Sequence, residues 1–460
     1  MGFIGLAMKR LPFLLCALGS LLTVATAKEK EKETREDFGK ILFDEKLWTK
    51  KLSDLVHVEK KKEKDEKMEK RLRERLTEEG ITIHEEKKGL QWLSSAKEGL
   101  RSSPDYFKLC EKDVGEIVIR GDDGKPENVS ISLYNRGDDG AVTLSDFESD
   151  FSDWKRLLTE KVGNAGHERN AKGAVSIEGW MWTKGDSAYL LEASTSKREN
   201  RAEFMRLRVA SISASENKRD RVVKRSSLEE NVKKDDEGYT YINGVPMVDQ
   251  GEKGYCVVAS VERIGRYMGL EVDQHELAQV ANTGNHGTTN DDMEKAFQRI
   301  TGRIHVRTLK LIDYDDRDFE RDVKTYNRAA KKAGVQTFDV DLDEYMVSPV
   351  MFWSQAHPET FREVKGGQNQ CDFFQGKIKD YIDQGIPLAW TLFLGMFKEG
   401  DLPQSWGGHM RLITGYKFEQ GEVPMILYTD SWGEGHARKT MRLDEAFCMT
   451  MGLYAMVPNQ

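Results

Sequence analysis

A cysteine, a glutamine and a glycine-bounded loop in the C-terminal half of the chain have the types and spacing to attack a carbonyl group. Cys256 follows a loop that ends in Gly254 and Tyr255, and it opens an apolar run whose spacing predicts a helix reaching Met268. Backbone N–H groups and the helix dipole favour a thiolate in the first turn of a helix. Gln250 stands six positions earlier and could bring a carboxamide N–H to the same point. Together these groups can attack a carbonyl carbon and hold the resulting oxyanion.

The thiol needs a base, and His409 is the histidine best placed to be one. Among nine histidines it alone follows a glycine pair, ending in Gly408, at the start of an apolar stretch that predicts a strand over 407–416. The next stretch, 425–429, predicts an antiparallel neighbour and ends at Asp430, which could bind the second ring nitrogen. A nucleophile, a base and an orienting carboxylate therefore follow one another along the chain.

Two other histidines are alternatives. His436 lies in the segment Gly435–Ala437 and is the rival base, although that setting predicts a loop. His286 lies in the glycine-rich segment Thr283–Thr289, which could border a cleft.

The blocks Gln250–Cys256, Gly408–His409 and Asp430–Gly433 resemble those of the papain-like cysteine peptidases. They match in order, in the six-residue step from glutamine to cysteine, and in the Ser-Trp-Gly that closes the third block. The aspartate and the Gly-Tyr-Cys sequence are more similar to the bacterial bacteriocin-processing (double-glycine leader) type. The resemblance covers about residues 240–458.

The resemblance implies an α+β fold in which a helical subdomain headed by Cys256 faces an antiparallel β subdomain carrying His409 and Asp430. It also implies a cysteine peptidase that hydrolyses peptide bonds through a thioester. His409 would take the thiol proton and later protonate the leaving amine, while Gln250 and the backbone N–H of Cys256 hold the oxyanion. We expect the cleft to be lined by Gly254, Tyr255, Gly408 and Trp432.

The first residues have the features of an export signal. Lys9 and Arg10 precede the apolar run Leu11–Val24, which is shorter than the roughly 20 residues that span a bilayer. Small residues at 25–27 then suit a signal peptidase. We therefore expect residues 1–27 to be a signal peptide cleaved near Ala27, and the mature protein to be exported, periplasmic or extracellular, without a membrane span.

Composition divides the rest of the 460-residue chain into segments. Residues 28–109 are dense in alternating Glu and Lys, which predicts a charged helical segment. Residues 110–212 predict a small β-rich domain, and residues 213–238 predict a charged linker. Residues 239–460 would then be the papain-like domain.

Short apolar stretches predict the strands of the β-rich domain, at 116–120, 129–134, 141–144, 174–182, 188–193 and 204–209. The pentapeptide Arg-Gly-Asp-Asp-Gly occurs twice, at 120–124 and at 136–140. Asp-Gly between strands predicts hairpin turns, whereas a calcium loop needs more ligands at fixed spacing.

Charge and cysteine usage bound the partners. The net charge of −8, with acidic and basic residues well mixed, gives no reason to expect nucleic acid. No His/Cys cluster has zinc spacing and no glycine-rich loop suits a phosphate, so we expect a peptide or protein substrate and neither a metal nor a cofactor. Cys371 and Cys448 could pair as a disulfide or be packed thiols.

Two other functions stay open. One is a non-catalytic peptide-binding protein of the same fold, which the intact set of Gln250, Cys256, His409 and Asp430 disfavours. The other is a transglutaminase-like acyl transferase, which would differ from a hydrolase in requiring an amine acceptor.

Overall fold

The computed structural model is an α+β protein built from antiparallel sheets and helices around two hydrophobic cores. The first core gathers buried side chains between Phe38 and Val209, and the second between Leu228 and Val457. The structure describes residues 35–58, 89–93, 99–103, 106–172, 175–216, 225–251, 254–270, 272–281, 306–338, 349–399, 402, 406–433 and 435–458. We call residues 35–216 the N-terminal half and residues 225–458 the C-terminal half.

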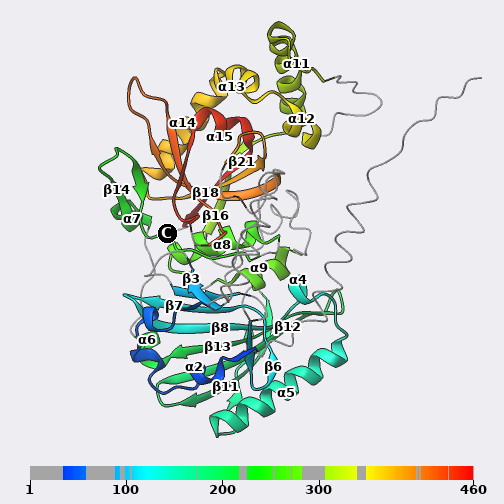
Figure 1. The fold of residues 1–460 in the computed structure, drawn as a ribbon, viewed down its shortest axis with the longest axis vertical. Coiled ribbons are helices and arrows are strands. Elements are labelled where there is room, and N and C mark those ends of the chain that lie inside the picture. The colour runs from blue at the N-terminus through cyan, green and yellow to red at the C-terminus, as the bar shows by residue number, and fades with distance from the viewer. Residues whose placement is uncertain are drawn as a thin grey trace, which may run out of the picture.

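A long antiparallel sheet organises the N-terminal half (Figure 1). From one edge to the other its strands are β10 (Ala171–Lys172), β11 (Ser176–Lys184), β12 (Ser187–Ser196), β13 (Arg201–Ser211), β8 (Lys125–Asn135), β7 (Ile117–Asp122), β4 (Gly99–Ser102), β3 (Gly89–Trp92) and β2 (His57–Val58), with β9 (His167–Glu168) also paired to β11. Alternate residues of the central strands, such as Ile117 and Ile119, are fully buried, as expected when one face of a sheet packs on a core.

The first Arg-Gly-Asp-Asp-Gly segment forms the predicted hairpin turn. β7 and β8 pair in antiparallel register across it, and Asp123 and Gly124 both have positive φ, at 46° and 75°. Two central residues with positive φ match the right-handed twist of the flanking strands.

The second copy of this segment differs from the prediction, because residues 136–139 form the short helix α4 (Arg136–Asp139). The strand predicted at 141–144 is also wrong, since α5 (Leu144–Val162) begins there. Thr143 caps α5 by accepting the N–H of Asp146, and α5 packs on the sheet through Phe147, Phe151, Trp154, Leu158 and Val162. The helix cap at Thr143 therefore outweighs the strand preference of the short apolar run.

Where residues 28–109 are described, they differ from the expected charged helix. They hold β2, β3 and β4, the strands β1 (Glu36–Asp37) and β5 (Phe107–Leu109), and the short helical segments α2 (Gly39–Leu42), η1 (Leu47–Thr49) and η2 (Leu52–Asp54). β1 and β5 form a small sheet with β6 (Lys112–Asp113), which follows this stretch. The reason is a set of fully buried leucines that attach these segments to the first core, namely Leu42, Leu47, Leu52, Leu90 and Leu100. The charge-dense stretch 59–88 lies outside the described residues.

A second antiparallel sheet organises the C-terminal half. Its strands run in the order β14 (Val232–Lys234), β15 (Thr240–Ile242), β18 (Gly407–Lys417), β17 (Leu388–Leu394), β21 (Thr450–Pro458) and β16 (Val306–Asp313), while β19 (Met425–Thr429) pairs with β18 and with β20 (Lys439–Arg442). β18 and β19 are the antiparallel neighbours that the sequence predicts. The expected linker differs in part, because β14 belongs to this sheet and Leu228 is buried in the second core.

Helices surround this second sheet. They are α7 (Arg225–Leu228) with the 3-10 turn η3 (Glu229–Asn231), α8 (Cys256–Tyr267), α9 (Gln274–Ala281), α11 (Asp316–Ala333), α12 (Pro349–Gln355), α13 (Pro358–Gly366), α14 (Asn369–Ile382) and α15 (Leu443–Met449). The short helix α6 (Ile212–Glu216) packs instead against β13 of the first sheet. Figure 1 shows α8 and α9 between the two sheets. Among the described residues, no helix is long and apolar enough to cross a membrane.

Candidate active site

Cys256 is the first residue of α8, at the position the sequence predicts. The helix is amphipathic in sequence but almost wholly buried, since it is covered by the second sheet on one side and by the N-terminal half on the other. Cys256 itself is partly exposed, and it packs against the second core. A thiol at the N-terminus of a buried helix faces unpaired backbone N–H groups and the positive end of the helix dipole.

Arg263 joins this helix to the strand end that carries Asp430. Its guanidinium is buried and donates to the Pro246 carbonyl (2.8 Å), to the Asp430 carbonyl (2.8 Å) and to Thr429 Oγ1 (2.6 Å). Charge-assisted hydrogen bonds of this kind are stronger than neutral ones. Arg263 therefore fixes the distance between α8 and the end of β19.

His409 lies on β18 and is paired with Asp430. Its Nε2 lies 2.7 Å from Asp430 Oδ1, and both side chains are almost completely buried. Leu412 of β18 faces Thr429 of β19, so the antiparallel register brings the end of β19 beside the start of β18. This register is what places the two residues together although they are 21 positions apart.

Asp430 is held ionised by its other partners. Arg411 Nε donates to Oδ2 (2.7 Å), and the backbone N–H of Ser431 donates to Oδ1 (2.8 Å). Burial alone would favour the neutral acid, but the charges and hydrogen bonds of His409 and Arg411 hold the pKa of Asp430 well below its usual range. The site therefore contains a fixed carboxylate.

The imidazole of His409 favours its charged form. Burial opposes the imidazolium, but the charge and hydrogen bond of Asp430, with a smaller contribution from Cys256, raise the pKa of His409 to about 9. Because Asp430 occupies Nε2, the nitrogen left for the sulfur is Nδ1. Among the described residues, Nδ1 is buried and has no hydrogen-bond partner. The arrangement suits transfer of a proton from Sγ to Nδ1.

Gln250 is oriented by Ser431. The Ser431 hydroxyl donates to Gln250 Oε1 (2.6 Å), and the backbone N–H of Gln250 donates to the backbone carbonyl of Ser431 (2.8 Å). Since the carboxamide oxygen is used by Ser431, its NH₂ group points away from that bond and is the end that can act as a donor. Gln250 is thus bonded to the residue that directly follows Asp430 in the chain.

The four residues expected to line a cleft have different settings. The Trp432 ring stacks on the His409 ring, with centroids 4.3 Å apart and planes 12° apart, so it covers one face of the imidazole. Gly408 is exposed, and a Cβ there would meet nothing within 4 Å, which leaves open space before His409. Gly254 is half-buried. Tyr255 is buried and points to the N-terminal half, so it does not line a cleft.

The rival base has another role. The backbone carbonyl of His436 accepts the Asp430 N–H (2.9 Å), and its ring packs edge-on against Trp432 at 5.7 Å. His436 thus stabilises the backbone around Asp430. His286 lies outside the described residues.

The other thiols of the described residues are shielded. Burial raises the pKa of Cys110, and it raises the pKa of Cys371 to about 12 and that of Cys448 further. Cys371 and Cys448 are both free and lie in the second core, so the disulfide considered for them is not formed here. No group of three or more His, Cys, Asp or Glu side chains within the described ranges is placed to hold a metal ion.

Sequence patterns missed the second layer of this site, which consists of Arg263, Arg411 and Glu399, and they gave Ser431 only a place in the Asp430–Gly433 block. Arg411 Nη1 donates to both carboxylate oxygens of Glu399, each at 3.0 Å, so Glu399 in turn holds the guanidinium against Asp430. A signal was present for Arg411, because it stands two positions after His409 on a strand and alternate residues share a face. No protein-family model matches the chain, and a search of curated proteins finds no similar sequence.

Proposed function

We propose that the protein is an exported cysteine peptidase with a papain-like C-terminal half, which hydrolyses peptide bonds through a thioester. The observation that supports this most is the buried His409–Asp430 pair, whose imidazole has a raised pKa and a free nitrogen for the Cys256 sulfur. A packing histidine would need neither a buried, ionised carboxylate at one ring nitrogen nor a second nitrogen left without a partner among the described residues.

The proposed reaction has two stages. His409 Nδ1 takes the proton of Cys256 Sγ, and the thiolate attacks the carbonyl carbon while Gln250 and the backbone N–H of Cys256 hold the oxyanion. The imidazolium then gives its proton to the leaving amine, and a thioester remains. In the second stage His409 takes a proton from water, the hydroxide attacks the thioester, and the thiol is regenerated with release of the acid. Each oxyanion donor would lower the barrier by about 2.7–4 kcal/mol.

The test combines labelling with hydrolysis. Wild-type protein, Cys256→Ala and Cys110→Ala are treated with iodoacetamide near neutral pH and the alkylated peptides are identified by mass spectrometry, and hydrolysis of fluorescein-labelled casein is followed in parallel. We expect wild type and Cys110→Ala to hydrolyse casein and to be alkylated at Cys256, and Cys256→Ala to lose hydrolysis entirely. Hydrolysis that survives in Cys256→Ala contradicts the proposal.

An amine acceptor separates hydrolysis from acyl transfer. Casein is incubated with and without a fluorescent primary amine, since a thioester resolved by an amine incorporates it into the protein. We expect casein fragments and no incorporation, and incorporation without fragments would favour the acyl transferase.

A further inference from the structure

The N-terminal half contacts the residue that precedes each of two groups used in the proposed reaction. Tyr255, next to Cys256, donates its hydroxyl to Asn135 Oδ1 (3.2 Å). Asp249, next to Gln250, accepts from Arg101 Nη1 at its Oδ2 (2.9 Å). Both contacts join the N-terminal half to the C-terminal half.

Asn135 is a rigid acceptor. Its backbone N–H donates to Asp139 Oδ2 (2.7 Å) and its Nδ2 donates to Asp138 Oδ2 (3.1 Å), while its Oδ1 also accepts the N–H of Gly137 (3.1 Å). These bonds cap α4, and Asn135 and Tyr255 are each 2% exposed. The Tyr255 hydroxyl is therefore bound to a side chain that cannot rotate freely.

Gly137 brings α4 against the same hydroxyl. A Cβ at position 137 would lie 2.7 Å from the Tyr255 hydroxyl oxygen and 3.2 Å from the ring carbon that bears it. Position 137 is helical with no positive φ, so a larger residue is excluded there by Tyr255 rather than by the backbone. The close fit limits how far Tyr255, and with it the start of α8, can move.

Arg101 makes the corresponding contact beside Gln250. Its Nε donates to Glu116 (2.9 Å) and so orients the guanidinium that binds Asp249. Asp249 Oδ1 accepts the N–H of Gly251 (2.8 Å), which folds the chain around Gln250. A displaced Asp249 would move the carboxamide donor with it.

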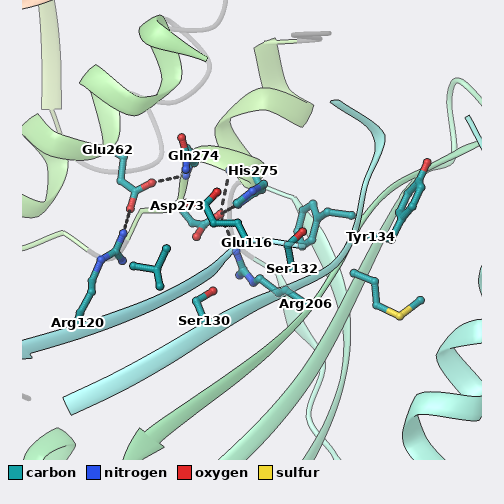
Figure 2. A pocket seen from close by; sticks show the side chains of 13 residues that line it. Glu116, Arg120, Ser130, Ser132, Tyr134, Arg206, Glu262, Asp273, Gln274 and His275 are labelled. Atoms are coloured by element: carbon teal, nitrogen blue, oxygen red, sulfur yellow. Dashed lines mark hydrogen bonds and ion pairs between the residues drawn. The ribbon is translucent and has the colours of Figure 1, made fainter. Parts of the chain in front are cut away.

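A third contact reaches the middle of α8. Glu262 is fully buried; its Oε1 accepts from Arg120 of β7 (3.2 Å) and its Oε2 accepts the backbone N–H of Gln274 (2.6 Å). Figure 2 shows these groups around a cavity of about 30 Å³ between the sheet and the helices α8 and α9. The cavity has the volume of about one water, so the two halves pack closely here.

We propose that the N-terminal half is an activating part of the peptidase, in which Asn135 and Arg101 are positioning residues for Cys256 and Gln250. The inference rests on the proposed function. The three contacts support the backbone behind the nucleophile and the oxyanion donor, whereas an inhibitory pro-region acts by covering the groups that meet the substrate. The N-terminal half is therefore retained in the working enzyme.

The test measures how the contacts affect the thiolate in the full-length protein. The rate of Cys256 alkylation by iodoacetamide at about pH 6 is divided by the rate at about pH 10, where a thiol outside an ion pair is ionised too, so changes in access cancel. The variants are Asn135→Ala, Gly137→Ala, Tyr255→Phe and Arg101→Met. Ser194→Ala is the matched control, because Ser194 also crosses the interface but binds Gln279 of α9.

We expect Gly137→Ala and Asn135→Ala to lower this ratio roughly tenfold, because small displacements of reacting groups are costly. The double variant Gly137→Ala/Tyr255→Phe should recover part of the loss, since removing the hydroxyl makes room for the methyl group, and a purely destabilising Gly137→Ala would not be rescued. Arg101→Met should slow casein hydrolysis, and Ser194→Ala should behave as wild type.

Other outcomes overturn the inference. Ratios and hydrolysis that stay at wild-type values in all variants would show that the contacts do not position Cys256 or Gln250. Faster hydrolysis in the variants would identify an inhibitory pro-region instead. Failure of the proposed function is distinct, because wild type itself would then show the same low ratio as His409→Ala.

Discussion

Two opposing effects act on the pKa of His409, and their balance decides whether its imidazole is charged. Its burial disfavours a cation, yet the carboxylate of Asp430 more than compensates and raises the pKa of His409 to about 9. Arg411 and Glu399 keep that carboxylate in place, so the charge of His409 depends on a chain of paired groups rather than on one pair.

Asp430→Asn should therefore lower the pKa of His409 from about 9 to below the ordinary value of 6.5, because burial remains while the compensating charge is lost. The measurement is an NMR titration of the ¹³C-labelled imidazole, assigned with His409→Gln. Glu399→Gln is the control one contact further out, and it should move the titration less. An unchanged titration in Asp430→Asn would mean that Asp430 does not set the charge of His409.

The same pair makes stability depend on pH. The folded pKa of His409, about 9, lies above the value of 6.5 expected in the unfolded chain, so its contribution is fully present below about pH 6.5. That contribution is lost as pH rises through about 9, and the free energy of unfolding should fall by a few kcal/mol across this window. Urea unfolding at several pH values measures it. Asp430→Asn should flatten the slope, and an equally steep slope in that variant would assign it to other groups.

At the scale of helices and strands, Arg263 holds α8 against the end of β19. Arg263→Met would leave the carbonyls of Pro246 and Asp430 and the hydroxyl of Thr429 without their buried donor. We expect a loss of at least about 3 kcal/mol in the free energy of unfolding, measured by urea denaturation. Lys324→Met on α11 removes an exposed ion pair with Glu320 and should change stability by less than about 1 kcal/mol. Equal effects of the two variants would contradict a special role for Arg263.

The elements that carry the candidate site were predictable because each is marked locally. A glycine-bounded cysteine before an apolar run predicted α8, and two apolar stretches joined by a short connection predicted β18 and β19. The start of α5 differs from the prediction, because the short apolar run 141–144 predicts a strand although Thr143 and Asp146 signal a helix start. The strands of residues 89–102 were missed because two buried leucines in a charged stretch give too short a pattern to read.

Contacts between distant residues were not predictable, and they include the second layer of the site. Tyr255 and Asn135 are 120 positions apart, and Arg263 and Asp430 are 167 apart. A charged residue within an apolar run, such as Arg263, interrupts the pattern and gives no sign of its partner. Only the folded arrangement of the chain shows that these polar groups are satisfied in the interior.

At the scale of the whole molecule, Arg206 forms ion pairs with two residues of the other half. It is 3% exposed and pairs with Glu192 of its own sheet (2.7 Å) and, across the interface, with Asp273 (2.7 Å) and Glu276 (2.6 Å). Although burial favours the neutral acid, the Arg206 charge holds the pKa of Asp273 well below its usual range. One buried cation thus neutralises carboxylates from both halves, and removing it leaves them facing each other.

Arg206→Met should therefore uncouple the two halves. Losing one partner of a buried ionic group costs about 3–5 kcal/mol, because the remaining charges stay desolvated. We expect wild type to unfold in one calorimetric transition and Arg206→Met to unfold in two, since each half has its own core. Arg208→Met is the matched control, because Arg208 pairs with Glu192 within the same half and is 45% exposed, so its variant should keep one transition. A single transition at the wild-type temperature in Arg206→Met would show that apolar packing alone couples the halves, and the activating role of the N-terminal half would then rest on Asn135 and Arg101.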